Sequence, residues 1–175
     1  MKDLDDFSKF LTDEELAKVA PMLERLTTLD KRADQQENYM SFVKHVWPQF
    51  IEGSHHKIYA EKLQAVADGK LKRLIINMPP RHTKSEFASY LFPTWLMGRR
   101  PDLKIIQATH TAELAVGFGR KIKNLIETEE FKDVFPTVSL APDAKASGRW
   151  STSGGGEYYA VGVGGALAGR GADLA

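Results

Sequence analysis

The sequence predicts an α/β fold with a parallel sheet, because short apolar segments alternate with helical ones along its second half. Residues 73–77 (RLIIN) and 103–108 (LKIIQA) are the runs expected of strands that are buried on both faces. Helices are expected over residues 85–97, where Pro93 should distort the last turn, and over about 111–127. The order strand, helix, strand, helix implies parallel strands joined by right-handed crossovers.

The N-terminal part of the chain should be helical. Thr12 and Glu15 have the spacing of a capping box, so a helix should begin directly after Thr12, and Pro21 should kink or divide it. Two more helices are expected over about residues 33–46 and 56–67. The last of these should end at a glycine that suits a helix C-terminus.

The C-terminal part has a shorter and more strand-like pattern. Residues 149–152 and 157–161 should form two strands joined through a glycine-rich turn at 153–156. A second glycine-rich stretch over residues 162–171 precedes residues 172–175, which could open another strand. We therefore expect the α/β domain to be truncated at this point.

Composition excludes several kinds of site and indicates one kind of partner. The chain has 175 residues and no cysteine, which excludes disulfides, thiolate metal sites and cysteine nucleophiles. No apolar run approaches the roughly 20 residues that a membrane span needs. The net charge of +1 is unevenly distributed. Residues 1–69 have 9 Lys and Arg and 13 Asp and Glu, residues 70–123 have 11 and 3, and residues 124–175 have 4 and 7. The middle block, at +8, indicates a polyanion such as nucleotide or nucleic acid, or else a solvated face.

The turn over residues 78–85 (MPPRHTKS) carries the most specific chemistry. A phosphate loop needs inward N–H groups, a helix N-terminus, a lysine that reaches the β and γ phosphates, and a hydroxyl for Mg²⁺. Lys84 and Ser85, expected at the first turn of a helix, supply the last two. The usual glycines six residues and one residue before the lysine are absent, because Met78 and Thr83 stand there. The alternative is a proline-rich connection with an incidental Lys-Ser pair.

Three segments resemble the large subunits of phage terminases. Residues 73–86 (RLIINMPPRHTKSE) are similar to that family's deviant Walker A region. Residues 109–115 (THTAELA) are similar to the segment after the neighbouring strand, and residues 164–174 (GGALAGRGADL) resemble the glycine-rich approach to the Walker B strand. The three segments occur in the family's order, and the resemblance covers about residues 50–175.

The resemblance implies a fold and a domain organisation. Residues 51–175 would form part of a P-loop NTPase core of the RecA or helicase type, after a helical segment over residues 1–50. The Walker B aspartate, the catalytic glutamate and the nuclease domain would follow Ala175. The chain is then expected to bind ATP and Mg²⁺ but to hydrolyse ATP poorly alone.

The resemblance also implies an activity and partners. Terminase large subunits couple ATP hydrolysis to the translocation of double-stranded DNA into a procapsid. The implied partners are double-stranded DNA, the small terminase subunit, the portal of the procapsid and further copies of the chain in a ring on that portal, with no membrane. The place of action would be the cytoplasm of an infected bacterial cell, not the mature virion. Two alternatives stay open, a helicase-like DNA-dependent ATPase and a non-catalytic DNA- or capsid-binding module.

Individual roles follow for the residues of the turn. Lys84 should contact the β and γ phosphates and stabilise charge during phosphoryl transfer, as a catalytic residue. Ser85 should be the Mg²⁺ ligand, or otherwise a helix-capping serine. The remaining residues expected to line the bound nucleotide here are Pro80, Arg81, His82, Thr83 and Glu86.

Two arginines and two aromatic residues complete the candidate site. Arg81 resembles the loop arginine proposed as a finger acting in cis, and Arg170 is the second candidate, acting on a neighbouring subunit's nucleotide. We favour Arg81. Tyr59 and His56 should lie beside the adenine, since the family places that region there. Alternatively, Tyr59 packs its helix against the sheet.

Overall fold

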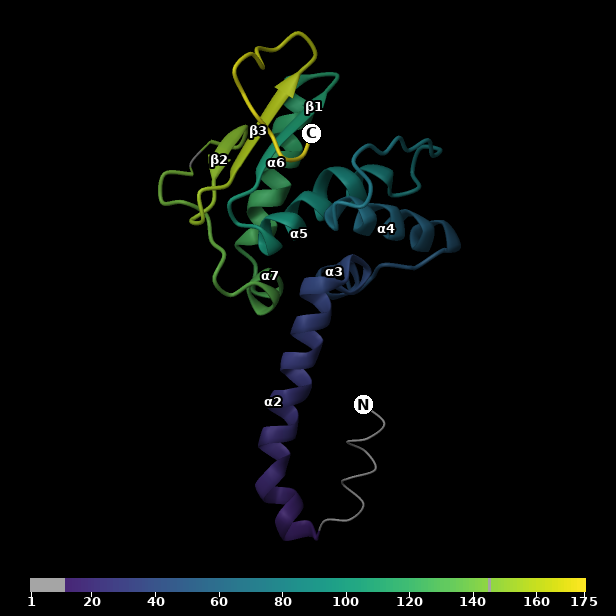
Figure 1. Cartoon of the computed structure of the whole chain (residues 1–175), viewed down its shortest axis with the longest axis vertical. Helices are drawn as coiled ribbons and strands as arrows, with labels where there is room; N and C mark the ends of the chain where they lie inside the picture. Colours follow the sequence, from purple (N-terminus) through teal and green to yellow (C-terminus); the bar gives the residue numbers. More distant parts are fainter. Residues whose placement is uncertain (1–11, 145) are drawn as a thin grey trace.

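Helices form the N-terminal half of the molecule and a small sheet forms its C-terminal part (Figure 1). The computed structural model describes residues 12–144 and 146–175. The first residues of the expected helical segment, 1–11, lie outside the described residues. Within the described ranges no helix is both long enough and apolar enough to cross a membrane.

Helix α2 (Asp13–Glu37) begins as the sequence predicts. The Thr12 side chain accepts a hydrogen bond from the Glu15 N–H, and the Glu15 carboxylate accepts one from the Thr12 N–H, so the capping box is confirmed. Pro21 lies inside the helix without dividing it. Figure 1 shows the N-terminal part of α2 projecting away from the other helices and from the sheet.

The prediction of a single helix over residues 33–46 is wrong, because Asn38 interrupts it. Asn38 has an extended backbone with φ −113° and ψ 113°, so α2 ends before it and α3 (Tyr39–Val46) begins after it. Its side chain caps α3 by accepting a hydrogen bond from the Ser41 N–H at 3.1 Å. An asparagine can favour a cap over a helix interior in this way.

Helix α4 (Ser54–Ala67) confirms the third predicted helix. It ends at Asp68 and Gly69, and Gly69 has φ +71°, the left-handed conformation that glycine adopts at helix ends. The chain then runs without regular secondary structure toward the turn at residues 78–85.

The predicted buried strand over residues 73–77 is wrong. This segment has no strand partner in the described chain, and Ile75 is 87% exposed. Leu74 and Ile76 are half-buried against the core, so every second side chain faces inward. A strand needs a neighbouring strand to pair with. The edge of the sheet at Ile105 pairs with Leu174 and not with residues 73–77.

The predicted helix after the turn is present, with its distortion in an unexpected place. Residues 84–85 are helical and lead into a π-helical segment, η1 (Glu86–Leu91), and then α5 (Phe92–Arg99). Within η1 the Phe92 N–H donates to the Phe87 carbonyl five residues earlier. Pro93 has no N–H and would clash with the carbonyl four residues before it, so the wider π turn lies upstream of the proline.

The sheet has three strands in the order β1-β3-β2. Strands β1 (Lys104–Thr109) and β3 (Glu157–Gly162) are parallel, whereas β2 (Arg149–Ser151) is antiparallel to β3. The three strands confirm those predicted near these positions, but the sheet is mixed and not wholly parallel as expected. The expected strand at residues 172–175 is a single parallel bridge from Ile105 to Leu174.

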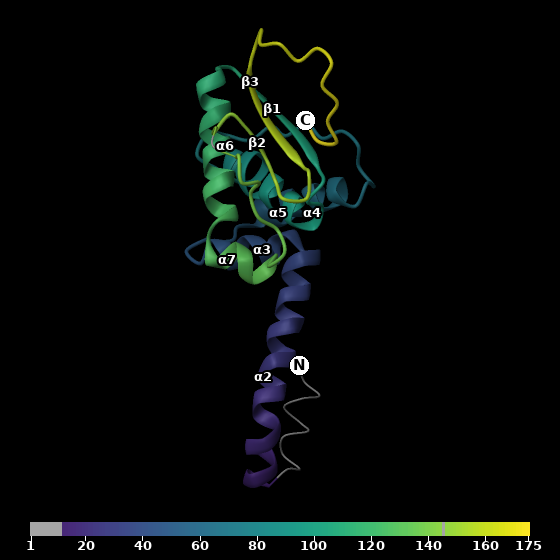
Figure 2. The same ribbon diagram turned by 90° about the vertical axis from the view of Figure 1, so that its left-hand side faces the viewer.

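Two helices connect β1 to β2. Helix α6 (Ala112–Ile126) confirms the prediction for residues 111–127 and packs against β1 and β3 on one face of the sheet (Figure 2). A short helix, α7 (Glu129–Val134), follows it and was not predicted.

One aromatic cluster joins the N-terminal helices to the helix after the turn. Tyr39 of α3 is fully buried, and its ring contacts Phe87, Phe92 and Trp95 at centroid distances of 5.3 to 5.8 Å. Its hydroxyl donates to the Phe87 carbonyl at 2.8 Å. The core therefore extends across the expected boundary at residue 50 and fixes the helix that follows the turn.

A candidate phosphate-binding turn

The turn at residues 78–85 contains two strained backbone positions. Arg81 has φ 63° and Thr83 has φ 58°, and both lie in the left-handed region that favours glycine. This conformation costs an L-residue with a side chain roughly 1–2 kcal/mol. Thr83 stands directly before the lysine, where a phosphate loop usually has glycine. The backbone thus has a conformation that glycine adopts easily, without glycine in the sequence.

The strained positions leave backbone donors free. A turn that alternates between right- and left-handed residues directs successive N–H groups to one side, which makes a concave anion site. Among the described residues, no acceptor pairs with the N–H groups of Arg81 and Thr83. The turn can therefore offer several hydrogen bonds to one anion.

Lys84 and Ser85 begin the helix that follows the turn. The Lys84 Nζ donates to the Met78 carbonyl at 3.2 Å, so the lysine side chain closes back over the turn. Ser85 is exposed and its side chain makes no capping hydrogen bond. The ammonium is thus held at the start of the turn, and the hydroxyl belongs to the first turn of the helix that follows it.

A chain of hydrogen bonds ties Thr83 to helix α4. The Gly53 N–H donates to Nδ1 of His56 at 2.9 Å, so the proton of the neutral ring lies on Nε2. Nε2 then donates to Oγ1 of Thr83 at 2.7 Å, and Oγ1 donates to the His82 carbonyl at 2.7 Å. Burial lowers the pKa of His56, with the neighbouring His55 adding to the effect. The ring is therefore held in its neutral form.

Tyr59 supports the same region from one turn further along α4. Its hydroxyl donates to the Lys84 carbonyl at 2.9 Å, and burial raises its pKa, so the phenol keeps its proton. The Tyr59 ring stacks on Phe87 at 5.5 Å, and the His56 ring stacks on the same residue at 5.3 Å. Both residues are buried, and Tyr59 packs its helix against Phe87 and the turn, not against the sheet as the alternative had it.

The other predicted site residues lie in different surroundings. Pro80 and His82 are exposed, and the His82 ring donates from Nδ1 to the Pro80 carbonyl at 2.9 Å. Glu86 faces α6 and pairs with Lys121 at 2.7 Å. Arg170 lies over the ring of Tyr159 on β3, 4.0 Å from its centroid. The structure thus brings Arg81, Thr83, Lys84, Ser85, His56 and Tyr59 together and leaves Arg170 on the sheet.

Metal ligands are sparse in this region. Across residues 12–144 and 146–175 no group of three or more His, Asp or Glu side chains could hold a metal ion. A Mg²⁺ ion bound here would take Ser85 as its protein ligand and phosphate oxygens and water for the rest, which suits the ion's preference for oxygen and for partial hydration.

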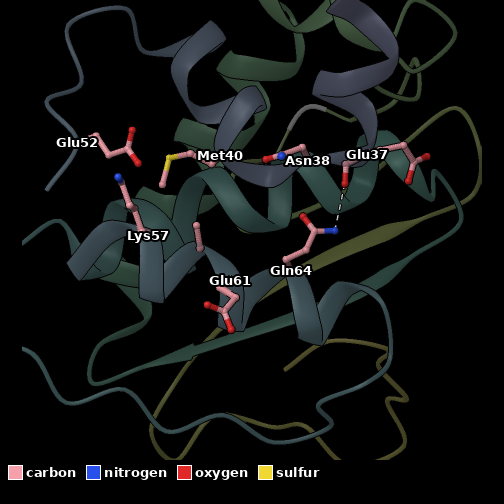
Figure 3. A pocket seen from close by; sticks show the side chains of 8 residues that line it. Glu37, Asn38, Met40, Glu52, Lys57, Glu61 and Gln64 are labelled. Carbon is pink, nitrogen blue, oxygen red and sulfur yellow. Dashed lines mark hydrogen bonds between the residues drawn. The ribbon is translucent and has the colours of Figure 1, made fainter. Parts of the chain in front are cut away.

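Two of the cavities beside helix α4 lie near the turn or its supporting helices. One of about 280 Å³ lies between α4 and residues 74–78, beside the turn, and has a mostly apolar lining that includes Ile58 and Ile75. The other, of about 330 Å³, lies where α2 and α3 meet α4 and is lined by Glu37, Glu52 and Glu61 (Figure 3). Three carboxylates against one lysine, Lys57, make the second cavity less suited to a phosphate than the turn.

The contact between His56 and Thr83 could not be found from the sequence. The two residues are 27 positions apart, and neither belongs to a motif that links them. A threonine at a position that requires a left-handed backbone was the available signal, because such a residue needs a compensating partner.

No protein-family model, curated protein or solved structure matches the chain.

Proposed function

We propose that the turn at residues 78–85 binds the phosphates of ATP with Mg²⁺, as the front part of a P-loop ATPase. One observation carries the proposal: Arg81 and Thr83 adopt the left-handed conformations that a glycine-rich phosphate loop provides, directly before Lys84. Free N–H groups, a lysine and a hydroxyl at one place form the donor set that a triphosphate needs.

Each group has a distinct part in binding. The N–H groups of the turn donate to phosphate oxygens. Lys84 exchanges the Met78 carbonyl for the β and γ phosphates, which are better acceptors because they are charged. Ser85 offers its free hydroxyl to Mg²⁺, and the bound ion neutralises charge on the phosphates. Arg81, exposed at the turn, is the arginine best placed to contact the γ phosphate.

The proposal extends to the class of ATPase. We propose a terminase-like motor that uses ATP to move double-stranded DNA, with the small terminase subunit and the portal as partners. The resemblance of residues 73–86, 109–115 and 164–174 supports this, as does the +8 charge of residues 70–123. In such a motor Arg170, held on the sheet by Tyr159, would act on a neighbouring subunit's nucleotide.

The test is binding of a fluorescent ATP analogue with Mg²⁺. The wild-type chain should bind it, and Lys84→Ala should bind it roughly tenfold to a hundredfold more weakly, since a charge-assisted hydrogen bond is worth about 1.5–3 kcal/mol. Lys132→Ala is the matched control, because Lys132 is a surface lysine of α7 paired with Glu129. Wild-type chain that binds no analogue, or equal binding by Lys84→Ala, would contradict the proposal.

A further inference from the structure

We propose that His56 is a positioning residue that acts through Thr83 and holds the turn in its anion-binding form. The inference rests on the proposed function for its consequence in ATP binding. The contact itself does not depend on that function, because Nε2 of His56 lies 2.7 Å from Oγ1 of Thr83 in the structure.

The first step is that Thr83 needs an external restraint. A β-branched residue at φ 58° is disfavoured, and a free turn with threonine there would leave this conformation for most of the time. The Thr83 hydroxyl offsets the strain, because it accepts from His56 and donates to the His82 carbonyl. The two bonds fix the side chain and, through it, the backbone on either side.

The second step is that His56 is itself fixed. The ring is 6% exposed, stacks on Phe87 and meets Phe50 edge to face at 4.8 Å. The Gly53 N–H binds Nδ1 and thereby directs the ring proton toward Thr83. The ring is thus rigid, has one tautomer and can transmit the position of α4 to the turn.

The third step is that, within residues 12–144 and 146–175, no other side chain makes a hydrogen bond to the Thr83 hydroxyl. The hydroxyl of Tyr59, on the same helix, donates to the Lys84 carbonyl and not to Thr83. The His55 ring is tilted by 42° against the His56 ring at a centroid distance of 3.8 Å and lies 5.8 Å from the His82 ring, but it makes no hydrogen bond to Thr83. Removing His56 therefore removes the restraint, while removing His55 leaves it.

The deciding experiment is a double-mutant cycle on affinity for the fluorescent ATP analogue. His56→Ala should weaken binding by about tenfold, because the measured affinity falls with the fraction of turns in the competent form. Thr83→Val, which keeps the shape but loses the hydroxyl, should weaken binding by a similar factor. In a Thr83→Gly background, His56→Ala should change the affinity less than twofold, because glycine needs no restraint. His55→Ala is the control for loss of an imidazole.

A tenfold effect of His56→Ala in both the threonine and the glycine backgrounds would overturn the inference, as would no effect in either. A nitrogen NMR spectrum of the histidine rings gives a readout that does not depend on nucleotide. The inference requires a protonated Nε2 and an unprotonated Nδ1 on His56 in the wild-type chain, with the His56 signals altered in Thr83→Val. If the wild-type chain binds no ATP analogue, the proposed function fails and the spectrum alone tests the inference. The opposite tautomer of His56, or His56 signals unchanged in Thr83→Val, would then contradict it.

Discussion

Thr83 has a backbone conformation that disfavours a branched side chain, so its hydroxyl bonds become important to the turn. The bonds to His56 and His82 replace the freedom that glycine would have brought. Lys84 is restrained in a similar way by Tyr59 beneath its carbonyl and by Met78 at its ammonium. At this scale the candidate site consists of ordinary residues that are held in an uncommon geometry.

The neutral form of His56 makes the stability of the chain depend on pH. Burial and the charge of His55 lower its pKa below 6.5, while Glu52 opposes them and His82 adds to them. The unfolded chain then binds more protons than the folded chain below about pH 6.5, so the free energy of unfolding should fall as the pH drops through that value. Above it, the contribution of His56 is fully present.

Urea unfolding at pH 7.5, 6.5 and 5.5 tests this expectation. The wild-type chain should lose stability between the first and last pH by more than His56→Gln does, because glutamine does not titrate. His55→Gln should reduce the slope only in part, because burial, the larger cause of the lowered His56 pKa, remains. Parallel slopes for the wild-type chain and His56→Gln would show that His56 is not the group responsible.

The residues of the turn were predictable from the sequence to different degrees. Lys84 and Ser85 at the start of a helix follow from their place after an apolar run and a pair of prolines. The roles of His56 and Tyr59 beneath the turn do not, because they depend on how α4 packs against Phe87. Local sequence carries information about a helix start but not about which side chain from a distant helix reaches it.

Helix α6 offers a sharp comparison between two of its glycines. A Cβ at Gly119 would lie 2.3 Å from the Ser147 carbonyl oxygen and 2.6 Å from the Tyr158 ring, whereas at Gly117 nothing lies within 4 Å. Gly119 thus permits α6 to approach the sheet closely, and Gly117 has no such purpose in the packing.

Alanine at these two positions should have opposite effects. Gly117→Ala should stabilise the chain by about 0.8–1 kcal/mol, the difference in helix propensity. Gly119→Ala should destabilise it by about 1–3 kcal/mol or more, because α6 must move away from Tyr158. The free energies of unfolding in urea provide the measurement, and similar values for the two variants would show that α6 does not pack on the sheet as described.

Local sequence signals predicted the starts and ends of helices well, but they predicted poorly which segments pair with others far away in the sequence. The capping box at Thr12 and the glycine after Asp68 act within a few residues, and both structures are present. Asn38 was missed because the helical pattern continues on both sides of it, although its cap on Ser41 divides α2 from α3. Residues 73–77 have a strand-like composition, but pairing depends on a neighbouring strand and not on composition.

At the scale of the whole molecule, the sequence indicated an α/β fold correctly but not the directions of its strands. The parallel pair β1 and β3 flanks α6, as a crossover predicts. The antiparallel strand β2 has only three residues and pairs through Trp150 and Tyr158, whose rings stack at 5.1 Å. So short a strand leaves little periodicity from which to predict its direction.

The distribution of charge makes a prediction about DNA. Residues 70–123 carry +8 and include the turn, the helix that follows it, β1 and most of α6. A terminase-like chain should bind double-stranded DNA without sequence preference and lose about a hundredfold in affinity between 50 and 200 mM salt, the loss for about four phosphate contacts.

Fluorescence anisotropy with two duplexes of unrelated sequence measures both properties. Equal affinities and a steep fall with salt would agree with contacts to the phosphate backbone. Binding that is absent at low salt, or unaffected by salt, would contradict the DNA-motor part of the proposal while leaving ATP binding to its own test.

A turn without glycine also gives up less disorder when the chain folds. Glycine has more backbone freedom to lose than any other residue, but at a position with positive φ the strain of another residue outweighs the entropy that is saved. At Arg81 and Thr83 the folded turn is strained, while the unfolded chain has less backbone entropy to lose than it would with glycine. The hydrogen bonds of Thr83 hold the turn in this shape without a bound anion, so the backbone loses little further entropy when an anion binds.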